Sequence, residues 1–177
     1  MIFAPQAKKN HPGRIIAVSG THGTGKTTAA YTRAADLKKQ YPQKTIGFIC
    51  ETATLCPYPI NREACPTAQA WIFHAQIKAE LDALYWYDMV VSDRTCIDAI
   101  AYTWCLGFHE LALAMIRMAG VHVQNYKEIH FHLAKDHPCC FDDGVRDQSD
   151  DQWRSQVESE MLSIYSRFTT MERLRYV

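Results

Sequence analysis

The strongest constraint on the fold of this chain is an eight-residue run, GTHGTGKT, at residues 20–27. It directly follows a β-branched run, RIIAVS, and directly precedes a stretch rich in helix-forming residues that starts at Lys26. The run satisfies the pattern G-x-x-x-x-G-K-[ST] in full. Glycines let the backbone approach an anion closely, and a helix that begins at the turn adds the positive end of its dipole. A strand, such a turn and a helix in succession predict a loop that binds phosphate.

The residues of this loop have separate predicted tasks in binding ATP with Mg²⁺. The Lys26 ammonium reaches the β- and γ-phosphates, and the Thr27 hydroxyl ligates the metal ion. His22 is a spacer without a predicted contact. We expect the nucleotide to contact the loop and the first helical turn at Gly20, Gly23, Thr24, Gly25, Lys26, Thr27 and Thr28.

Strands and helices alternate along the rest of the sequence. Short apolar runs predict strands at 14–19, 45–50, 89–92, 128–133 and 174–177. Apolar residues at helical spacing predict helices at 26–40, 67–87, 97–105, 108–119 and 151–171, with Phe73, Ile77 and Leu81 on the apolar face of the second. This order predicts the α/β class, as a three-layer P-loop NTPase fold with a five-stranded parallel sheet and helices on both faces. The 177 residues suit one domain, which we expect over 14–177 after a flexible lead-in at 1–13.

Charged residues follow the second and third predicted strands, at the edge where ligands bind in a parallel sheet. Asp93 closes the third strand and is expected to hold Mg²⁺ together with Thr27. Glu51 closes the second strand and is expected to take the proton from an acceptor hydroxyl, with Asp93 as the alternative base. An N-cap or a surface charge is the structural alternative for Glu51. Arg94 is expected to clamp phosphate or acceptor, with a structural ion pair as its alternative.

Residues 135–150 are polar and include the segment FDDGVR, which ends at Arg146. An acidic flap with a glycine and an arginine is typical of a lid. A closed lid would exclude water and place the Arg146 guanidinium on the transferring phosphate. A solvated loop is the alternative interpretation.

These elements in this order resemble the nucleoside and nucleotide kinases of the P-loop fold, over about residues 14–171. Glu51 and the run Asp93-Arg94-Thr95 look like the Glu and Glu/Asp-Arg-Ser elements of deoxyribonucleoside and thymidylate kinases. The run DDGVR at 142–146 looks like the lid of the ribosylnicotinamide kinase group. The resemblance implies that Lys26 and Thr27 bind ATP and Mg²⁺. It implies that Glu51 acts on the acceptor hydroxyl, and that Arg94 and Arg146 bind the phosphates.

The acceptor is expected to lie against the start of the helix at 67–87 and the Pro-rich loop before it. The resemblance implies aromatic stacking and an amide that pairs with a base here, and an amide suits this task because it both donates and accepts. The candidate residues are Trp71 and Gln76 on the helix and Tyr58 and Asn61 in the loop. Packing in the core is the alternative for the helical aromatic residues.

Charge balance and cysteine spacing bear on compartment and partners. Lysine plus arginine equals aspartate plus glutamate at 19 each, which argues against a protein that holds nucleic acid mainly by neutralising phosphates. The seven cysteines form no Cys-x-x-Cys pair, so reduced thiols in a cytoplasm fit better than disulfides or a zinc site. No apolar run approaches the length that spans a bilayer. The aromatic run at 85–87 fits a helix end or a subunit contact, which leaves a homodimer open.

Taken together, these features predict an ATP-dependent kinase that passes the γ-phosphate to a hydroxyl of a nucleoside-like or nucleotide-like small molecule. One alternative is a kinase of the hydroxymethyl group of a modified base in DNA, which the neutral charge disfavours. The other is a P-loop ATPase that acts as a regulatory switch. A switch needs no acceptor pocket. Because the sequence predicts such a pocket, the kinase is favoured.

Overall fold

Five parallel strands form a single sheet in a computed structural model that describes residues 14–134, 151–168 and 171–177. The strands are β1 (Arg14–Gly20), β2 (Ile46–Ile49), β3 (Met89–Asp93), β4 (Tyr126–His132) and β5 (Leu174–Tyr176). Their order across the sheet is β2-β3-β1-β4-β5, and every described pair is parallel. The predicted lead-in at 1–13 and the predicted lid with Arg146 lie outside the described residues.

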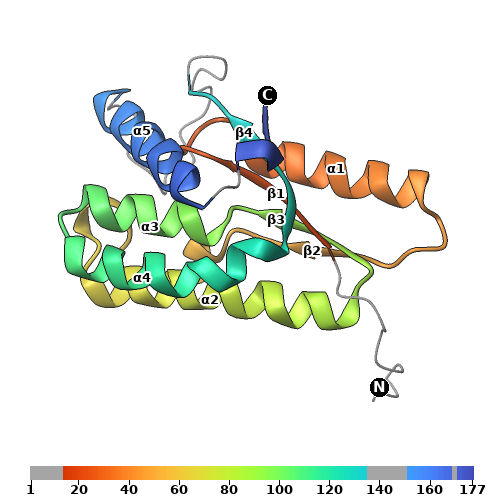
Figure 1. Ribbon diagram of the computed structural model, residues 1–177, viewed down its shortest axis with the longest axis horizontal. Coiled ribbons are helices and arrows are strands. Elements are labelled where there is room, and N and C mark those ends of the chain that lie inside the picture. Colours follow the sequence, from red (N-terminus) through yellow and green to blue (C-terminus); the bar gives the residue numbers. More distant parts are fainter. Residues whose placement is uncertain (1–13, 135–150, 169–170) are drawn as a thin grey trace.

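Helices cover both faces of this sheet (Figure 1). They are α1 (Lys26–Gln40), α2 (Pro66–Trp86), α3 (Cys96–Cys105), α4 (His109–His122) and α5 (Asp151–Arg167). Helix α1 packs on one face, and the other four helices lie on the opposite side. The three-layer α/β arrangement is therefore confirmed. Some helix and strand ends differ from the predicted ones. Helix α4 continues to His122, α5 stops at Arg167 and β4 begins at Tyr126.

The alternation of side chains along β1 explains the two cores. Ile16 and Val18 face α1 and pack with Ala30 and Leu37 of that helix. The alternate residues, Ile15 and Ala17, belong to the larger core that the other helices cover. A strand with both faces buried reads as a continuous apolar run, which is why RIIAVS shows no polar alternation.

Local sequence features determine where the turns and helices after β2 and β3 begin. Two 3₁₀ turns, Thr52–Leu55 and Asn61–Glu63, interrupt the predicted loop, and α2 then starts with Pro66 in its first turn. Helix α3 starts with a capping box, in which the Thr95 and Asp98 side chains each bond the other's backbone amide. Within the described ranges, no helix combines the length and apolarity that crossing a membrane requires.

The inner face of α2 differs from the predicted one. Leu81 is 51% exposed, whereas its neighbour Glu80 is completely buried, so the prediction that Leu81 faces the core is wrong. The Glu80 carboxylate tolerates burial because it accepts hydrogen bonds at 2.8 Å from the Gln76 amide, the Ser92 hydroxyl and the Tyr126 hydroxyl. His122 of α4 makes a further contact with Glu80 Oε2. These partners come from α2, β3, β4 and α4, so one carboxylate joins four elements behind the carboxyl end of β3.

The aromatic run at the end of α2 lies on the surface. Tyr85 and Trp86 are about half exposed and contact each other edge to face. Both therefore stay outside the core, and the homodimer stays a prediction.

Replacing Glu80 with alanine is expected to lower the free energy of unfolding by about 3–5 kcal/mol, because its buried donors lose their acceptor. The matched control is Asp82→Ala, two residues further along α2 in an exposed ion pair with Lys78, for which we expect a loss below about 1 kcal/mol. Urea unfolding at neutral pH measures both. Equal losses in the two variants would show that the buried cluster does not stabilise the fold.

Candidate active site

The run GTHGTGKT forms a tight turn between β1 and α1. Gly20, Gly23 and Gly25 have φ values of 133°, 70° and 71°, which L side chains rarely adopt. A Cβ atom on Gly20 would lie 2.5 Å from the carbonyl oxygen of His132 in β4, so close packing also requires glycine there. His132 holds the turn a second time, with Nδ1 2.9 Å from the Thr24 carbonyl oxygen. The Lys26 ammonium is buried inside the turn, where it donates to the Thr21 carbonyl and to Thr24 Oγ1.

A hydroxyl and a carboxylate meet at the start of α1. Thr27 Oγ1 donates to Asp93 Oδ2 at 2.6 Å, and this contact joins the loop to the end of β3. Burial raises the pKa of Asp93 above its ordinary value of 3.8, although the hydrogen bond from Thr27 and the charge of Arg94 oppose this shift. In the described part of the chain, no three His, Cys, Asp or Glu residues gather as a metal site. Two oxygen ligands beside a phosphate loop nevertheless suit Mg²⁺, which binds one or two protein oxygens together with substrate phosphates and water.

Arg94 is the central cation of the site. Its Nε lies 2.9 Å from Glu51 Oε1, and its Nη1 donates to the Gly20 carbonyl oxygen at 3.0 Å and lies 3.4 Å from Asp98 Oδ1. Burial disfavours the charged guanidinium, but the carboxylates around it outweigh burial and raise the pKa of Arg94, so it stays protonated. Its backbone φ of 93° is rare for a bulky residue. The Arg94 amide donates to the Val18 carbonyl at 2.9 Å, which holds this conformation.

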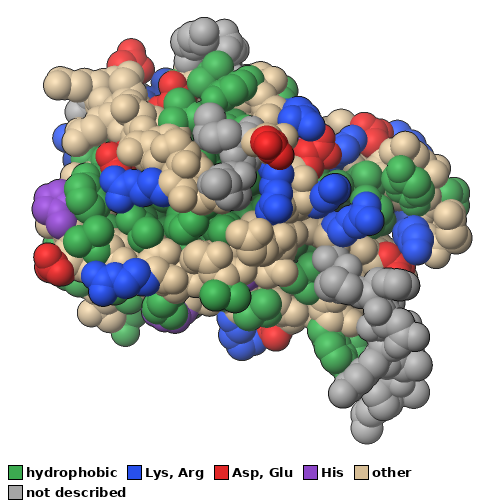
Figure 2. All heavy atoms as spheres, viewed as in Figure 1, with side chains coloured by type: hydrophobic (Ala, Val, Ile, Leu, Met, Phe, Trp, Pro, Cys, Tyr) green, Lys and Arg blue, Asp and Glu red, His purple; other side chains and the backbone are tan. Residues whose placement is uncertain are grey.

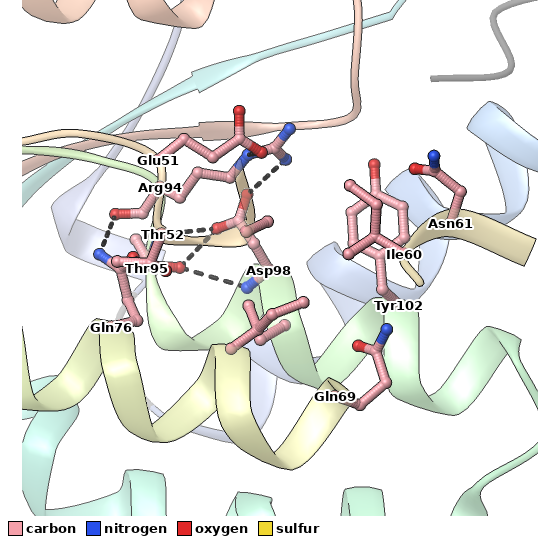
Figure 3. A pocket seen from close by; sticks show the side chains of 13 residues that line it. Glu51, Thr52, Ile60, Asn61, Gln69, Gln76, Arg94, Thr95, Asp98 and Tyr102 are labelled. Atoms are coloured by element: carbon pink, nitrogen blue, oxygen red, sulfur yellow. Dashed lines mark hydrogen bonds and ion pairs between the residues drawn. The ribbon is translucent and has the colours of Figure 1, made fainter. Parts of the chain in front are cut away.

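A pocket opens beside Arg94, beyond the carboxyl ends of β2 and β3 (Figure 3). The space between its walls, open mouth included, is about 620 Å³. Three segments form its walls: the turns after β2, one face of α2, and the chain from Arg94 through Tyr102 of α3. The polar or charged side chains that line it are Glu51, Thr52, Asn61, Gln69, Gln76, Arg94, Thr95, Asp98 and Tyr102.

Hydrogen bonds fix the wall that α3 contributes. Asp98 Oδ2 accepts from Ser19 Oγ at 2.9 Å, from the Thr95 amide at 3.0 Å and from Thr95 Oγ1 at 2.6 Å. Tyr165 of α5 reaches the same cluster, with its hydroxyl 2.8 Å from Ser19 Oγ and 2.9 Å from Thr95 Oγ1. Asp98 therefore faces Arg94 from a wall that β1 and α5 hold in place.

The structure brings most of the predicted residues together. Lys26, Thr27 and Asp93 lie at the turn, while Glu51 and Arg94 pair at the rim of the pocket. Thr28 lies in the first turn of α1, as predicted.

The predicted acceptor residues divide into two groups. Asn61 and Gln76 line the pocket, whereas Tyr58 and Trp71 do not. The face of α2 that lines the pocket carries residues 69, 72 and 76, and residue 71 points away from it because of the helical period. Tyr58 lies in the preceding loop with its ring partly exposed.

The Gln76 amide is committed to protein partners. Its Oε1 accepts from Thr52 Oγ1 at 2.9 Å, and its Nε2 donates to Glu80 and Ser92 and lies 3.4 Å from the Arg94 carbonyl oxygen. This geometry supports a positioning role and disfavours base pairing by Gln76.

Gln69, Asp98 and Tyr102 are among the lining residues that were not predicted as site residues from the sequence. Asp98 had a detectable signal, because Thr95-x-x-Asp98 before an apolar stretch has the spacing of a capping box. Tyr102 follows Asp98 by four residues and so lies on the same helical face. Gln69 had no such signal, since amides on both 69 and 76 fit the same face of α2.

A family model described as an AAA domain matches residues 15–171. The chain belongs to this family. No curated protein matches the sequence. The glycine turn, Lys26 and the Thr27–Asp93 contact all lie inside the matched range.

Solved structures with this fold include nucleoside and nucleotide kinases. NadR, in complex with NAD and AMP-PNP, superposes with a TM-score of 0.70 and 16% identity over 93% of this chain and 44% of that chain. Deoxyadenosine kinase from M. mycoides superposes with a TM-score of 0.58 and 13% identity over 92% and 89% of the two chains. Thymidylate kinase from Ehrlichia chaffeensis gives 0.55 and 16% over 94% and 93%. The chain thus spans less than half of NadR, and the predicted P-loop fold of nucleoside and nucleotide kinases is confirmed.

Replacing Asp93 with asparagine is expected to stabilise the protein at pH 7 and to remove the Mg²⁺ dependence of nucleotide binding. Because the pKa of Asp93 in the folded protein lies above 3.8, the folded protein binds the proton of the Asp93 carboxyl group more tightly than the unfolded chain does. Ionised Asp93 therefore destabilises the fold, increasingly as the pH rises from about 3.8 through the raised pKa. Urea unfolding at several pH values measures the difference, which we expect to vanish in acid.

The same variant is tested by titration with AMP-PNP with and without Mg²⁺, with Asp88→Asn as the control. Asp88 lies at the opposite end of β3, where it accepts from the Thr45 amide. An Asp93→Asn protein that keeps a wild-type response to Mg²⁺ would exclude Asp93 from metal binding.

Proposed function

We propose that this protein is an ATP-dependent, Mg²⁺-dependent kinase that phosphorylates a hydroxyl of a nucleoside-like acceptor. One observation carries the proposal: the Arg94 guanidinium touches the Gly20 carbonyl of the phosphate loop and Glu51 of the neighbouring pocket at the same time. A phosphate on the loop and an acceptor in the pocket would thus meet at one fixed cation. A positioned cation of this kind stabilises the charge of a transferring phosphoryl group.

The chain's own residues would share the steps of the transfer. Lys26 and the amides of the loop would hold the β- and γ-phosphates, and Thr27 and Asp93 would hold Mg²⁺, which neutralises phosphate charge when bound. The acceptor oxygen would attack the γ-phosphorus while the bond to the β–γ bridging oxygen breaks and ADP leaves. Glu51 would take the hydroxyl proton, because it lines the pocket whereas Asp93 is bonded to Thr27.

The charge of the pocket favours an acceptor without a phosphate. Among the described lining residues, Glu51 and Asp98 are acidic and Arg94 is basic, and Arg94 contacts both carboxylates. The lining thus carries one negative charge more than positive charge when all three are ionised. A phosphomonoester would meet this excess, whereas an uncharged or cationic nucleoside would not.

The amide of Gln69 is the best candidate for recognising a base. It is buried at the pocket wall, and its Oε1 accepts from Thr103 Oγ1 at 3.2 Å (Figure 3). The Thr103 hydroxyl also donates to the Ala99 carbonyl oxygen at 2.7 Å, so this contact leaves both ends of the Gln69 amide able to pair with a base edge. The similar structures support a nucleoside-like ligand, since NadR was solved in complex with NR and the M. mycoides kinase with dCMP and with dATP.

Two further observations bear on compartment and on DNA. All five cysteines in the described ranges are free thiols, which supports the proposed cytoplasmic location. On the face in Figure 2, Lys and Arg side chains are interspersed with acidic and uncharged ones. That distribution gives no continuous basic surface on this face for a DNA backbone.

Glu51→Gln is expected to lower kcat by about 10²- to 10⁴-fold, because the general base is lost, while the affinity for ATP is kept. Lys26→Ala is the comparison variant and should lose both transfer and tight ATP binding. The control is Glu63→Gln, an exposed carboxylate in the same connecting segment. Unchanged turnover in Glu51→Gln would move the role of base to another residue.

An acceptor panel tests the reaction itself. ATP turnover is measured with thymidine, deoxyadenosine and nicotinamide riboside, with their 5′-monophosphates, and with DNA that contains hydroxymethyluracil. We expect one nucleoside to be phosphorylated at least about 10-fold faster than its monophosphate, because like charges repel in the pocket. Phosphorylated DNA would select the DNA kinase instead, and hydrolysis that no acceptor changes would select the regulatory ATPase.

A further inference from the structure

One tyrosine touches both halves of the candidate site. Tyr102 of α3 lines the acceptor pocket (Figure 3), yet its hydroxyl lies 3.2 Å from the backbone nitrogen of His22 and 3.0 Å from His22 Nδ1. His22 is the third residue of the phosphate loop and lies 80 positions away in the sequence. The two rings are tilted, with centroids 6.4 Å apart, so the contact runs through the hydroxyl and not through stacking.

Two hydrogen bonds join Tyr102 to His22. The Tyr102 hydroxyl accepts from the His22 backbone N–H. It also pairs with Nδ1, as donor or as acceptor according to the tautomer of the ring. His22 is 3% exposed, so water does not compete for these bonds. Tyr102 thereby holds the His22 ring in one orientation.

The ring of Tyr102 contacts the central arginine as well. Arg94 Cζ lies 5.9 Å from the ring centroid, within the range of a cation–π contact. One side chain thus contacts the phosphate loop through its hydroxyl and Arg94 through its ring, and the same ring forms part of the pocket wall. A molecule in the pocket cannot displace this ring without disturbing a residue of the phosphate loop.

We propose that Tyr102 is a positioning residue that couples the acceptor pocket to the phosphate loop by holding the His22 ring in one orientation. The coupling to an acceptor rests on the proposed kinase function. The control of His22 does not, and it is a property of the free protein.

The first experiment reads His22 directly by ¹⁵N NMR of the histidine rings in the full-length protein. The signal of His22 is the one absent from His22→Gln. Loss of the hydrogen bond in Tyr102→Phe is expected to move the His22 Nδ1 signal away from its wild-type position. Tyr85→Phe removes an exposed hydroxyl at the far end of α2 and should leave the spectrum unchanged. A His22 Nδ1 signal that stays at its wild-type position in Tyr102→Phe would overturn the proposal.

The second experiment asks whether the phosphate loop responds to the loss of this bond. The Kd of Mg·AMP-PNP is expected to rise about 2- to 10-fold in Tyr102→Phe, which is the worth of one hydrogen bond. In the His22→Gln background the same replacement should have a smaller effect, because the ring partner is gone and only the backbone N–H of residue 22 remains. Equal effects in the two backgrounds would contradict the coupling through His22. Thermal melting checks that each variant is folded.

The third experiment uses whichever nucleoside of the acceptor panel is phosphorylated. Tyr102→Phe keeps the ring in the pocket wall, so the KM for that nucleoside should change less than 2-fold. The kcat for transfer should fall, and the share of ATP lost to hydrolysis should rise. A change in KM alone would assign Tyr102 to acceptor binding and overturn the coupling. If no acceptor is phosphorylated, the proposed function fails, while the NMR and affinity results still decide the role of Tyr102.

Discussion

The charge cluster around Arg94 is the interaction on which the site depends. Its guanidinium contacts the first strand at Gly20, the end of the second strand at Glu51, and the third helix at Asp98. Three segments far apart in the sequence therefore meet at one side chain. A buried guanidinium is costly alone, but the two carboxylates around it balance its charge, and these ion pairs together with the bond to the Gly20 carbonyl fix its position. The phosphate loop and the acceptor pocket are thus placed relative to each other by a single buried cation.

Two polar clusters hold the surroundings of this cation. Asp98 with Ser19, Thr95 and Tyr165 braces one side, and Glu80 with its four donors braces the other. Gln76 connects the second cluster to the carbonyl of Arg94. Such clusters rigidify a site when every member is satisfied, and they make single replacements costly. The acceptor pocket therefore has polar walls whose groups are largely occupied by the protein itself.

Sequence reasoning succeeded where the signal was local. The turn at residues 20–27 fixes a strand, a loop and a helix by its own glycines, and the parallel sheet then brings Glu51 and Asp93 to the same edge. The fold class could be predicted from this order of elements. Prediction from the sequence failed where the position of a side chain depends on packing between distant elements.

Glu80 illustrates this limit. Its burial depends on donors from three other elements, whereas the hydrophobic pattern favoured Leu81 beside it. In the same way, whether Gln69 or Gln76 is available to a ligand depends on which of the two amides already forms hydrogen bonds with neighbouring residues. Tyr102 reaches His22 only because α3 lies beside the phosphate loop, and no spacing in the sequence reports that contact.

The backbone of Arg94 has a consequence for how this sequence can vary. A left-handed conformation at a non-glycine residue costs about 1–3 kcal/mol, which glycine would avoid. Glycine has no side chain to reach Glu51 or Gly20, and it would leave the largely buried carboxylates of Glu51 and Asp98 without their counter-charge, at a cost of about 3–5 kcal/mol. This loss exceeds the gain from a relaxed backbone. Variants selected only for heat resistance are therefore expected to keep arginine at this position in spite of its strained backbone.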